Sequence, residues 1–371
     1  MSKFPFVVCL CLSLVACGGS GGETKATPSG GNPQPIDPVV NTSSLTGYML
    51  IVSDRVSGGI HQLVNMASGA YISLPRAVAN EKPLTTDIWY ASNLRATSRT
   101  LVRRDEFNDL AFVSGDTGVV LSEFGLSTFV GVNRPSFKGP VRVSPDGQRV
   151  LFAWQPDRDD SDTIKLSAFN RQGKELNAWS IPKAVYEGNY TWLDNATILF
   201  YEQNGSVLST VSLETGELIK SSNIIWPSKV EASSWLNISP DGTTLAWAVT
   251  MPFKNDAGAE NPKSTIWLSS VDGKNLRQLT TVTDKERNLP VQSPMSTIWA
   301  PSSKALAVHF GDDTHGGVGL PTGCHDMRLI STAATSLVAL DSVEISPKLA
   351  FPKTGALDPV CSLVGPEAWI D

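Results

Sequence analysis

The chain has 371 residues, with 30 lysines and arginines, 36 aspartates and glutamates, a formal charge of -6 and 41% hydrophobic residues. This composition suits one large folded domain or two modest ones, and it excludes a chain that is disordered throughout. A pI near 5.3 and the lack of any lysine or arginine run argue against a nucleic-acid partner, because neutralising phosphates requires a concentrated basic face.

The first seventeen residues have the form of an export signal. A short basic start, Met1–Lys3, precedes a mostly apolar run from Phe4 to Leu14. A membrane-spanning or buried helix is the alternative, but this run is shorter than the roughly 20 residues that a span requires. We therefore expect a signal peptide over residues 1–16.

The residues Leu14–Cys17, which read Leu-Val-Ala-Cys, resemble the lipobox of bacterial lipoproteins. The resemblance implies cleavage before Cys17 and attachment of fatty acyl chains such as palmitate to it, so that Cys17 holds the protein on a membrane. It also implies the outer membrane, because glycine rather than aspartate follows Cys17. We expect a lipoprotein of the bacterial cell envelope, on either the periplasmic or the surface side of the outer membrane.

Residues 17–44 are expected to form a flexible tether. From Gly18 onward they are rich in glycine, serine, proline and threonine and contain almost no large apolar side chain. A coil of this length spans about 30 Å, at roughly 5–6 Å times the square root of the residue count. No similar stretch occurs later, so residues 45–371 are treated as one domain.

A repeat of about fifty residues organises this domain. Residues 143–154 read VSPDGQRVLFAW and residues 238–249 read ISPDGTTLAWAV, 95 residues apart, and two degenerate copies cover residues 192–200 and 299–308. Each copy predicts a strand, a tight turn and a second strand. Second hairpins are predicted from Thr163, Ser206 and Thr265, and weaker ones from Ile60, Asp109 and Met327.

Six four-stranded units of this kind predict an all-β fold, a six-bladed β-propeller. The two ends of the chain complement each other. Residues 365–371 resemble a first strand that has no successor, and residues 48–53 resemble a second strand that has no predecessor. We expect these N- and C-terminal strands to complete one blade and close the ring.

The Ser-Pro-Asp-Gly turn, its apolar second strand and the following hairpin resemble the propeller repeats of the TolB family, over residues 45–371. The resemblance implies a TolB-like propeller, although a lipidated tether here stands where TolB has an N-terminal α/β domain. The motif specifies the fold and leaves the function open, because unrelated binders and enzymes share it.

The longest connections are expected on one face of the ring. They are residues 76–86, 126–138, 155–162, 223–231, 251–263, 281–293 and 310–324. Long loops are where binding residues concentrate, so this face is the default site, with neutral drift of loop length as the alternative. Acidic residues recur in these loops, at 157–162, 256, 260, 312 and 313. They suit a cation or a basic partner, or are merely solvated.

The last of these loops carries three of the four histidines. His309, His315 and His325, together with Asp312, are candidate ligands of a divalent cation such as zinc, manganese or iron. Their spacing matches no known metal motif, so histidines that serve only as hydrogen-bond partners are the alternative. No cofactor is predicted beyond this cation.

Two cysteines remain in the mature chain once Cys9 and Cys11 leave with the signal and Cys17 is acylated. In an oxidising compartment, Cys324 and Cys361 are expected to form a disulfide closing a loop of about 37 residues, with two buried thiols as the alternative.

The sequence contains no nucleophile elbow, zinc-protease motif or phosphate-binding loop. Seven tryptophans, at positions 89, 192, 235, 247, 267, 299 and 369, are interpreted as core between blades rather than as a row that stacks on sugars. We expect a non-enzymatic binding or scaffold module for a protein or another envelope component. The alternative is a metal-dependent enzyme, a lyase or hydrolase acting on polysaccharide or lactone, with the three histidines as ligands.

Overall fold

The structure is a computed structural model with two units, residues 1–36 and 37–371, and every described residue belongs to the second. The described residues are 39–41, 45–53, 60–75, 78–79, 82–83, 88–105, 108–126, 136–155, 163–182, 189–202, 206–230, 232–254, 258, 260–282, 296–310, 326–340, 342, 344–347, 349 and 368–371. Every regular element among them is a β-strand.

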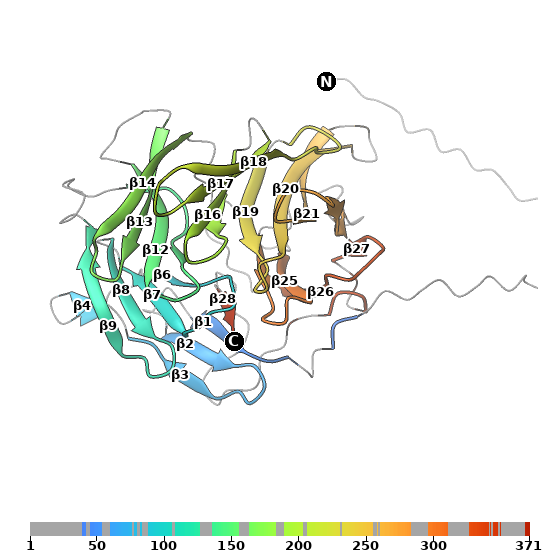
Figure 1. The fold of residues 1–371 in the computed structure, drawn as a ribbon. Coiled ribbons are helices and arrows are strands. Elements are labelled where there is room, and N and C mark those ends of the chain that lie inside the picture. Colours follow the sequence, from blue (N-terminus) through green and yellow to red (C-terminus); the bar gives the residue numbers. More distant parts are fainter. Residues whose placement is uncertain are drawn as a thin grey trace, which may run out of the picture. The chain divides into compact units, whose positions relative to one another are not determined.

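Six antiparallel sheets form six blades, each named here from its inner to its outer strand (Figure 1). Blade 1 consists of β28 (Ala368–Ile370), β1 (Tyr48–Ser53), β2 (Ile60–Asn65) and β3 (Tyr71–Ser73). Blade 2 consists of β6 (Ile88–Ala91), β7 (Thr100–Arg104), β8 (Asp109–Ser114) and β9 (Val120–Gly125). In blade 3, β10 (Ser136–Phe137) and β11 (Arg142–Val143) both pair with β12 (Arg149–Gln155), followed by β13 (Thr163–Asn170) and β14 (Glu175–Pro182).

Blade 4 consists of β15 (Tyr190–Trp192), β16 (Thr197–Glu202), β17 (Val207–Ser212) and β18 (Leu218–Asn223). Blade 5 consists of β19 (Ala232–Ile238), β20 (Thr244–Lys254), β21 (Glu260–Ser270) and β22 (Arg277–Gln278). Blade 6 consists of β24 (Ser296–Trp299), β25 (Ala305–Phe310) and β26 (Asp326–Ser331). Two short pairs lie outside this scheme, β4 (Val78–Ala79) with β5 (Lys82–Pro83), and β23 (Thr280–Thr281) with β27 (Val338–Ala339).

The inner strands form a closed ring. In the order β28, β6, β11, β15, β19 and β24, each contacts the next, and β24 contacts β28. The ring closes within blade 1, where Tyr48 pairs with Ile370 and Leu50 pairs with Ala368. The prediction of a six-bladed β-propeller, with N- and C-terminal strands completing one blade, is confirmed.

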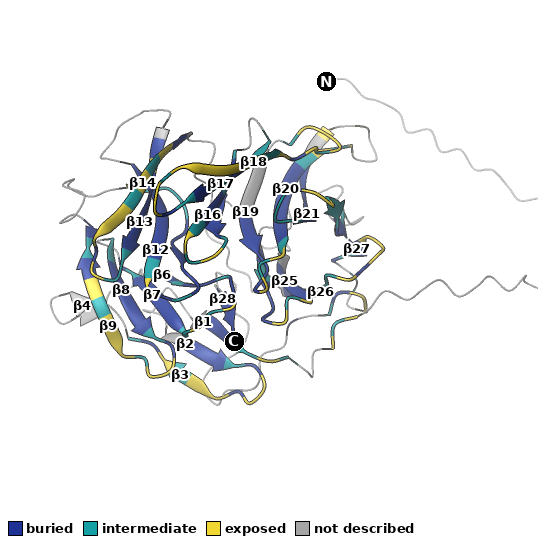
Figure 2. Cartoon of the chain, viewed as in Figure 1, coloured by how far each residue is buried: buried dark blue, intermediate teal, exposed yellow. Residues whose placement is uncertain are grey.

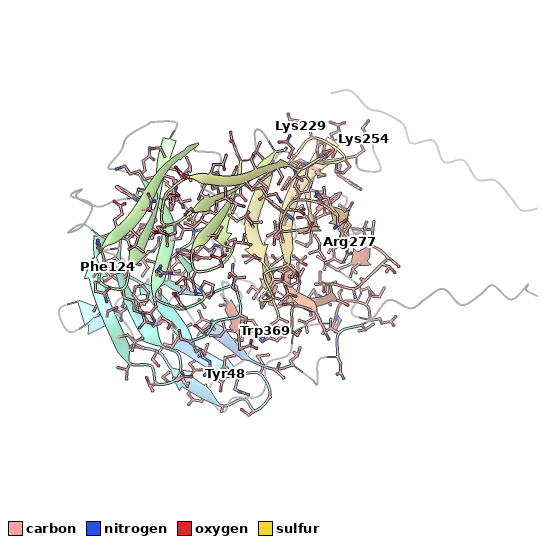
Figure 3. The ribbon with its side chains drawn as sticks, in the orientation of Figure 1. Tyr48, Phe124, Lys229, Lys254, Arg277 and Trp369 are labelled. Atoms are coloured by element: carbon pink, nitrogen blue, oxygen red, sulfur yellow. The ribbon has the colours of Figure 1, made fainter. Side chains whose placement is uncertain are left out.

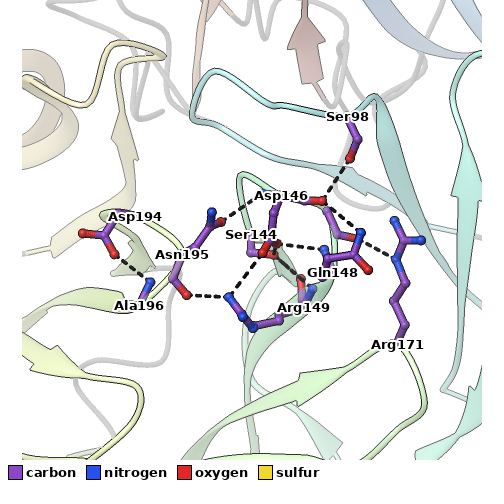
Figure 4. Close-up of polar contacts among 10 residues, drawn as sticks. Ser98, Ser144, Asp146, Gln148, Arg149, Arg171, Asp194, Asn195 and Ala196 are labelled. Atoms are coloured by element: carbon purple, nitrogen blue, oxygen red, sulfur yellow. Dashed lines mark hydrogen bonds and ion pairs between the residues drawn. The ribbon is translucent and has the colours of Figure 1, made fainter.

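The repeated turn is held by one hydroxyl group. Ser144 Oγ donates to Asp146 Oδ1 at 2.6 Å and accepts the backbone N–H of Arg149 at 3.0 Å, which joins the two ends of the turn (Figure 4). Ser239 does the same in blade 5, with Asp241 at 2.6 Å and the N–H of Thr244 at 2.9 Å. A short hydroxyl that both donates and accepts is the physical reason for serine at the start of this motif.

The core lies between neighbouring blades, whose facing strands are buried while the outer strands are exposed (Figure 2). Six of the seven tryptophans are buried there, at positions 89, 192, 247, 267, 299 and 369, and the side chain of Trp235 lies outside the described part. The indole N–H of Trp192 donates to the carbonyl of Arg142 at 2.9 Å, and that of Trp299 to the carbonyl of Asn237 at 3.2 Å. The interpretation as core is confirmed for these six, and two of them also join an inner strand to that of the preceding blade.

Blade 6 differs from the expected hairpin at residues 327–340. Instead, the backbone N–H of Leu329 in β26 donates to the carbonyl of Pro347 at 2.9 Å, and the N–H of Leu349 donates to the carbonyl of Met327 at 2.8 Å. The intervening β27 pairs in parallel with β23 beside blade 5. Val338 of β27 and the flanking residues Ala334 and Leu340 are buried between blades 5 and 6, so burial of this segment favours the neighbouring blade over a tight hairpin.

The expected loop at residues 251–263 is largely a β-ribbon. β20 and β21 remain paired out to Lys254 and Glu260. Pro252 and Pro262 occupy opposite positions on the two strands, so both missing N–H groups fall at one rung of the ladder and the pairing continues beyond it.

Candidate functional site

The strand order gives the ring two different faces. Inner strands run toward a face that carries the turns within each blade, and this turn face includes residues 66–69, 115–118, 145–148, 171–174, 193–196, 213–216, 240–243, 271–274 and 301–304. The opposite face carries the connections between second and third strands and the links between blades. We call it the connection face.

One connection on the turn face is long. The plug loop, Ser92–Arg99, joins β6 to β7 and reaches from blade 2 to blade 5, three steps around the ring. The backbone N–H of Arg95 donates to the carbonyl of Pro240 at 2.8 Å, and Asn93 Nδ2 donates to Asn237 Oδ1 at 3.0 Å. Between them Leu94 is buried in the core cluster of blades 3 to 5. The plug loop therefore lies across the centre of the ring.

Beneath the plug loop, Arg142 crosslinks three inner strands. Its guanidinium donates to the carbonyls of Tyr190 and Leu236 and to Asn237 Oδ1, each at 3.2 Å. Asn237 Nδ2 in turn donates to the carbonyl of Thr297 at 2.6 Å. Burial lowers the pKa of Arg142 to about 10, although the side chain remains charged at neutral pH. These buried polar groups satisfy one another's hydrogen bonds. Together with the plug loop above them, they close the ring at its turn face.

On the connection face, the link between blades 4 and 5 is anchored by an aromatic cluster. Trp226 donates its indole N–H to the hydroxyl of Tyr201 at 2.9 Å. Its ring packs edge-on against Trp247 and Trp267, with centroids 5.8 and 5.7 Å away. Burial raises the pKa of Tyr201, while hydrogen bonds to Ser206 and Trp226 lower it by less. The aromatic cluster fixes the backbone of the link.

The residues around Trp226 are displayed to solvent. Ile225 is 86% exposed, and Ser228 donates its hydroxyl to the sulfur of Met251 in β20 at 3.2 Å. Lys229 belongs to the link and Lys254 to the end of β20, and both side chains are exposed (Figure 3). Lys254 faces Glu260 across the ribbon at 3.8 Å. Of the acidic loop residues, Glu260 is therefore beside a lysine, and Asp256, Asp312, Asp313 and residues 157–162 lie outside the described part.

The sequence predicted a loop at residues 223–231 but not that it is anchored. The residues that indicate anchoring are Trp226 and the following Pro227. A large aromatic residue in such a loop indicates local packing, which holds neighbouring side chains in place.

The predicted metal ligands fall mostly outside the described residues. β25 and β26 are antiparallel neighbours, with His309 opposite Met327 and Phe310 opposite Asp326. The side chain of His309 and all of Asp312, His315 and His325 lie outside the described part, as do Cys17, Cys324 and Cys361. Within the described residues, no group of three or more His, Cys, Asp or Glu side chains is placed to hold a metal ion. Over those same residues, no helix has the length and apolar character to cross a membrane.

Comparisons with known proteins give only weak structural likenesses. No family model and no curated protein matches the chain. Among solved structures, it is similar to the β-propeller domain of Cps50 (Swd1) from Myceliophteria thermophila, at 12% identity and a TM-score of 0.43 over 82% of this chain and 88% of that one. It is also similar to a protein of unknown function from Bacteroides caccae, at 11% identity and a TM-score of 0.42 over 85% and 97% of the two chains.

A third likeness is to hydrazine synthase from Kuenenia stuttgartiensis, at 16% identity and a TM-score of 0.38 over 66% of this chain and 62% of that one. Likenesses at this level carry no argument about activity. The class of the protein follows from its own strand pairing: it is a six-bladed β-propeller, with one closed face and one face that displays an anchored link and a ribbon.

Proposed function

We propose that this protein is a lipid-anchored component of the bacterial envelope whose connection face binds a protein or another envelope component without chemical catalysis. The observation that carries the proposal is the contrast between the two faces. The plug loop and Arg142 close one, while the other presents Ile225 on a link fixed by Trp226.

The geometry of the link suits binding. An exposed apolar side chain on a backbone held by packed aromatic rings loses little conformational freedom when a partner covers it. The projecting β20–β21 ribbon widens the same surface. Propellers commonly use such loop-bearing faces for recognition, and this scaffold requires no catalytic group to do so.

The anchor and the TolB-like character belong to the proposal through the sequence motifs at Leu14–Cys17 and at the Ser-Pro-Asp-Gly turns. The anchor is tested by growing cells on an alkyne-bearing palmitate and comparing the full chain with Cys17→Ala. We expect the fatty acid on the wild-type chain and none on the variant. A wild-type chain that carries no fatty acid would remove the anchor from the proposal.

Binding is tested by site-specific photo-crosslinking in cells that express the full chain. A photoreactive residue replaces Ile225 or Lys254 on the connection face, and Gln172 or Glu214 on the turn face serves as the matched control. All four side chains are exposed. We expect the same discrete crosslinked protein from positions 225 and 254 and none from 172 and 214. Crosslinks only from the turn face, or none from any position, would contradict the proposal.

A second candidate function is a metal-dependent enzyme, favoured by the register of β25 and β26. In this register Phe310 lies opposite Asp326. His309 immediately precedes Phe310 in the sequence, and His325 immediately precedes Asp326. Metal analysis of purified protein separates the candidates. Stoichiometric zinc, manganese or iron that is lost in His315→Ala and His325→Ala would favour the enzyme, and its absence would remove the only residues on which that reading depends.

A further inference from the structure

Both ends of the propeller lie on its turn face. Tyr48 at the start of β1 pairs with Ile370 at the end of β28, and the carbonyl of Gly47 accepts the N–H of Met66 in a turn of blade 1 at 2.8 Å. Arg99 of the plug loop donates to the carbonyl of Asp371 at 2.9 Å. Thr46 and Gly47, which lead into β1, therefore lie at the closed face.

Exposed apolar side chains recur around the edge of the same face. Each outer strand begins there, directly after a turn. In four consecutive blades, exposed large apolar side chains lie at the start of this strand or directly before it. We call them the apolar rim: Tyr71 in blade 1, Val119, Val120 and Leu121 in blade 2, Leu176 in blade 3, and Leu218 and Ile219 in blade 4.

These side chains are not covered by neighbouring blades. Leu218 is 61% and Ile219 is 59% exposed, the latter next to the exposed Lys220. Single exposed apolar residues are ordinary on soluble proteins, but their return at one structural position in four blades places them along one edge. Charges of both signs are interspersed, as in Lys174 beside Glu175 and Lys220 near Glu217. The rim therefore suits an apolar contact better than attraction to one sign of charge.

We propose that the turn face lies against the lipid bilayer, with the apolar rim touching the membrane interface and the connection face pointing away from it. This inference rests on the proposed anchor at Cys17. The expected tether precedes β1 in the sequence, and β1 begins at the turn face, so a lipid on Cys17 would be tethered on the side of this face. The apolar rim then contacts the interface at high local concentration.

The strand β18 provides a matched pair of positions for the test. Ile219 lies near its start on the turn face and Ile225 lies just beyond its end on the connection face. The two carry the same side chain and are separated by about 20 Å of strand. Both are exposed, so replacement by a diazirine-bearing residue leaves the core unchanged.

The experiment uses the full acylated chain reconstituted in phosphatidylcholine vesicles that contain an alkyne-labelled lipid. After illumination, we expect at least fivefold more lipid attached at position 219 than at position 225. Vesicles with 30% phosphatidylglycerol should give the same ratio, since the contact is apolar. Equal labelling at the two positions, or more at 225, would overturn the orientation.

The mass of the Cys17 peptide is measured in the same samples, which separates the two proposals. An acylated chain without preferential labelling at 219 refutes the orientation and leaves the anchor intact. A chain without acylation refutes the anchor. In that case the orientation, which rests on the anchor, falls with it.

Discussion

At the scale of single residues, the recurring device is a serine hydroxyl paired with an aspartate two residues later. Ser144, Ser239 and Ser270 each donate to such a carboxylate at 2.6 Å. For Asp272, the hydroxyl of Ser270 and then the backbone and side chain of Lys274 lower the pKa to about 2. For Asp241, burial alone would raise the pKa, but hydrogen bonds from Ser239 and Thr243 outweigh it and the pKa is lowered.

These lowered pKa values predict acid sensitivity with a definite sign. An aspartate whose pKa is lower in the folded chain than in the unfolded one stabilises the fold above about pH 4, and this stability is lost as the pH falls towards 2. Ser270→Ala should therefore lower the urea midpoint at pH 7 and have little effect at pH 2. Ser302→Ala, at a turn serine that accepts only a long N–H contact from Lys304, is the control. An equal loss at both pH values would contradict this account.

Two glycines at equivalent turns separate backbone strain from crowding. Gly147 and Gly242 have φ values of +64° and +73°. A Cβ on Gly147 would lie 2.5 Å from Thr100, whereas one on Gly242 would meet only Leu94, at 3.6 Å. Gly242→Ala should cost about 1 kcal/mol of unfolding free energy from its φ alone. Gly147→Ala should cost about 2–4 kcal/mol, since it also displaces Thr100. Urea denaturation measures both, and equal losses would show that crowding is unimportant.

The Ser-Pro-Asp-Gly turns could be predicted from sequence because the bonds that shape each turn, from the serine hydroxyl to the aspartate and to the backbone five residues later, join residues within a few positions. The role of Arg142 could not. Its partners Tyr190, Leu236 and Asn237 are 48, 94 and 95 residues away, and nothing adjacent to Arg142 in the sequence marks it as buried.

At the scale of elements, the plug loop couples blades that are not neighbours. Leu94 belongs to a connection of blade 2 but is only 8% exposed, within the cluster formed by blades 3 to 5. This contact holds opposite sides of the ring together independently of the sheets.

Leu94→Ala should therefore cost about 2–4 kcal/mol of unfolding free energy, the range for a buried leucine truncated to alanine. Leu121→Ala, on the exposed outer strand β9, should change it by less than about 0.5 kcal/mol. Urea denaturation of both variants checks the difference. A cost below 1 kcal/mol for Leu94→Ala would mean that the plug loop is only loosely held.

Elements were predicted well where the repeat is regular and poorly where it departs from the period. The ribbon at residues 251–263 was expected to be a loop, but Pro252 faces Pro262, so their missing N–H groups fall at one place and the pairing continues beyond it. The outer position of blade 6 is filled at Pro347 and Leu349. The sequence could not show this, since the alternation in residues 327–340 suits a strand in either sheet.

At the scale of the whole molecule, three residues of β28 close the ring. Trp369 is buried between blades 1 and 6, and its indole N–H donates to the carbonyl of Thr46 at 2.7 Å. Tyr48 and Trp369 lie together where the chain ends meet (Figure 3). Closure was predictable because an unmatched first strand and an unmatched second strand stood at the two ends of the sequence.

Trp369→Ala should cost about 3–5 kcal/mol, the range for a buried tryptophan truncated to alanine. In a closed ring this loss reaches every blade, so hydrogen exchange should accelerate in β16 and β17 of blade 4 as well as in blades 1 and 6. Exchange measured by mass spectrometry tests this. Acceleration confined to blades 1 and 6 would show that the blades unfold independently.

Of the candidate site, the sequence predicted where to look but not what is there. Alternating strand directions place the links between blades and the connections between second and third strands on one face, but the long plug loop on the opposite face was not predicted. The cluster of Tyr201, Trp226 and Trp247 depends on packing between blades 4 and 5, which no local pattern encodes. The histidine and cysteine predictions stay predictions.

The meeting of Gly47 and Asp371 beside one another has a practical consequence for protein engineering. A short peptide joining the two positions would allow circular permutation, with new termini opened between the exposed turn residues Glu214 and Thr215. A tag or fluorescent protein fused after Asp371 would lie near Thr46 and Gly47, the residues that precede β1. A reporter meant to monitor the other face should instead be inserted at the tip of the ribbon.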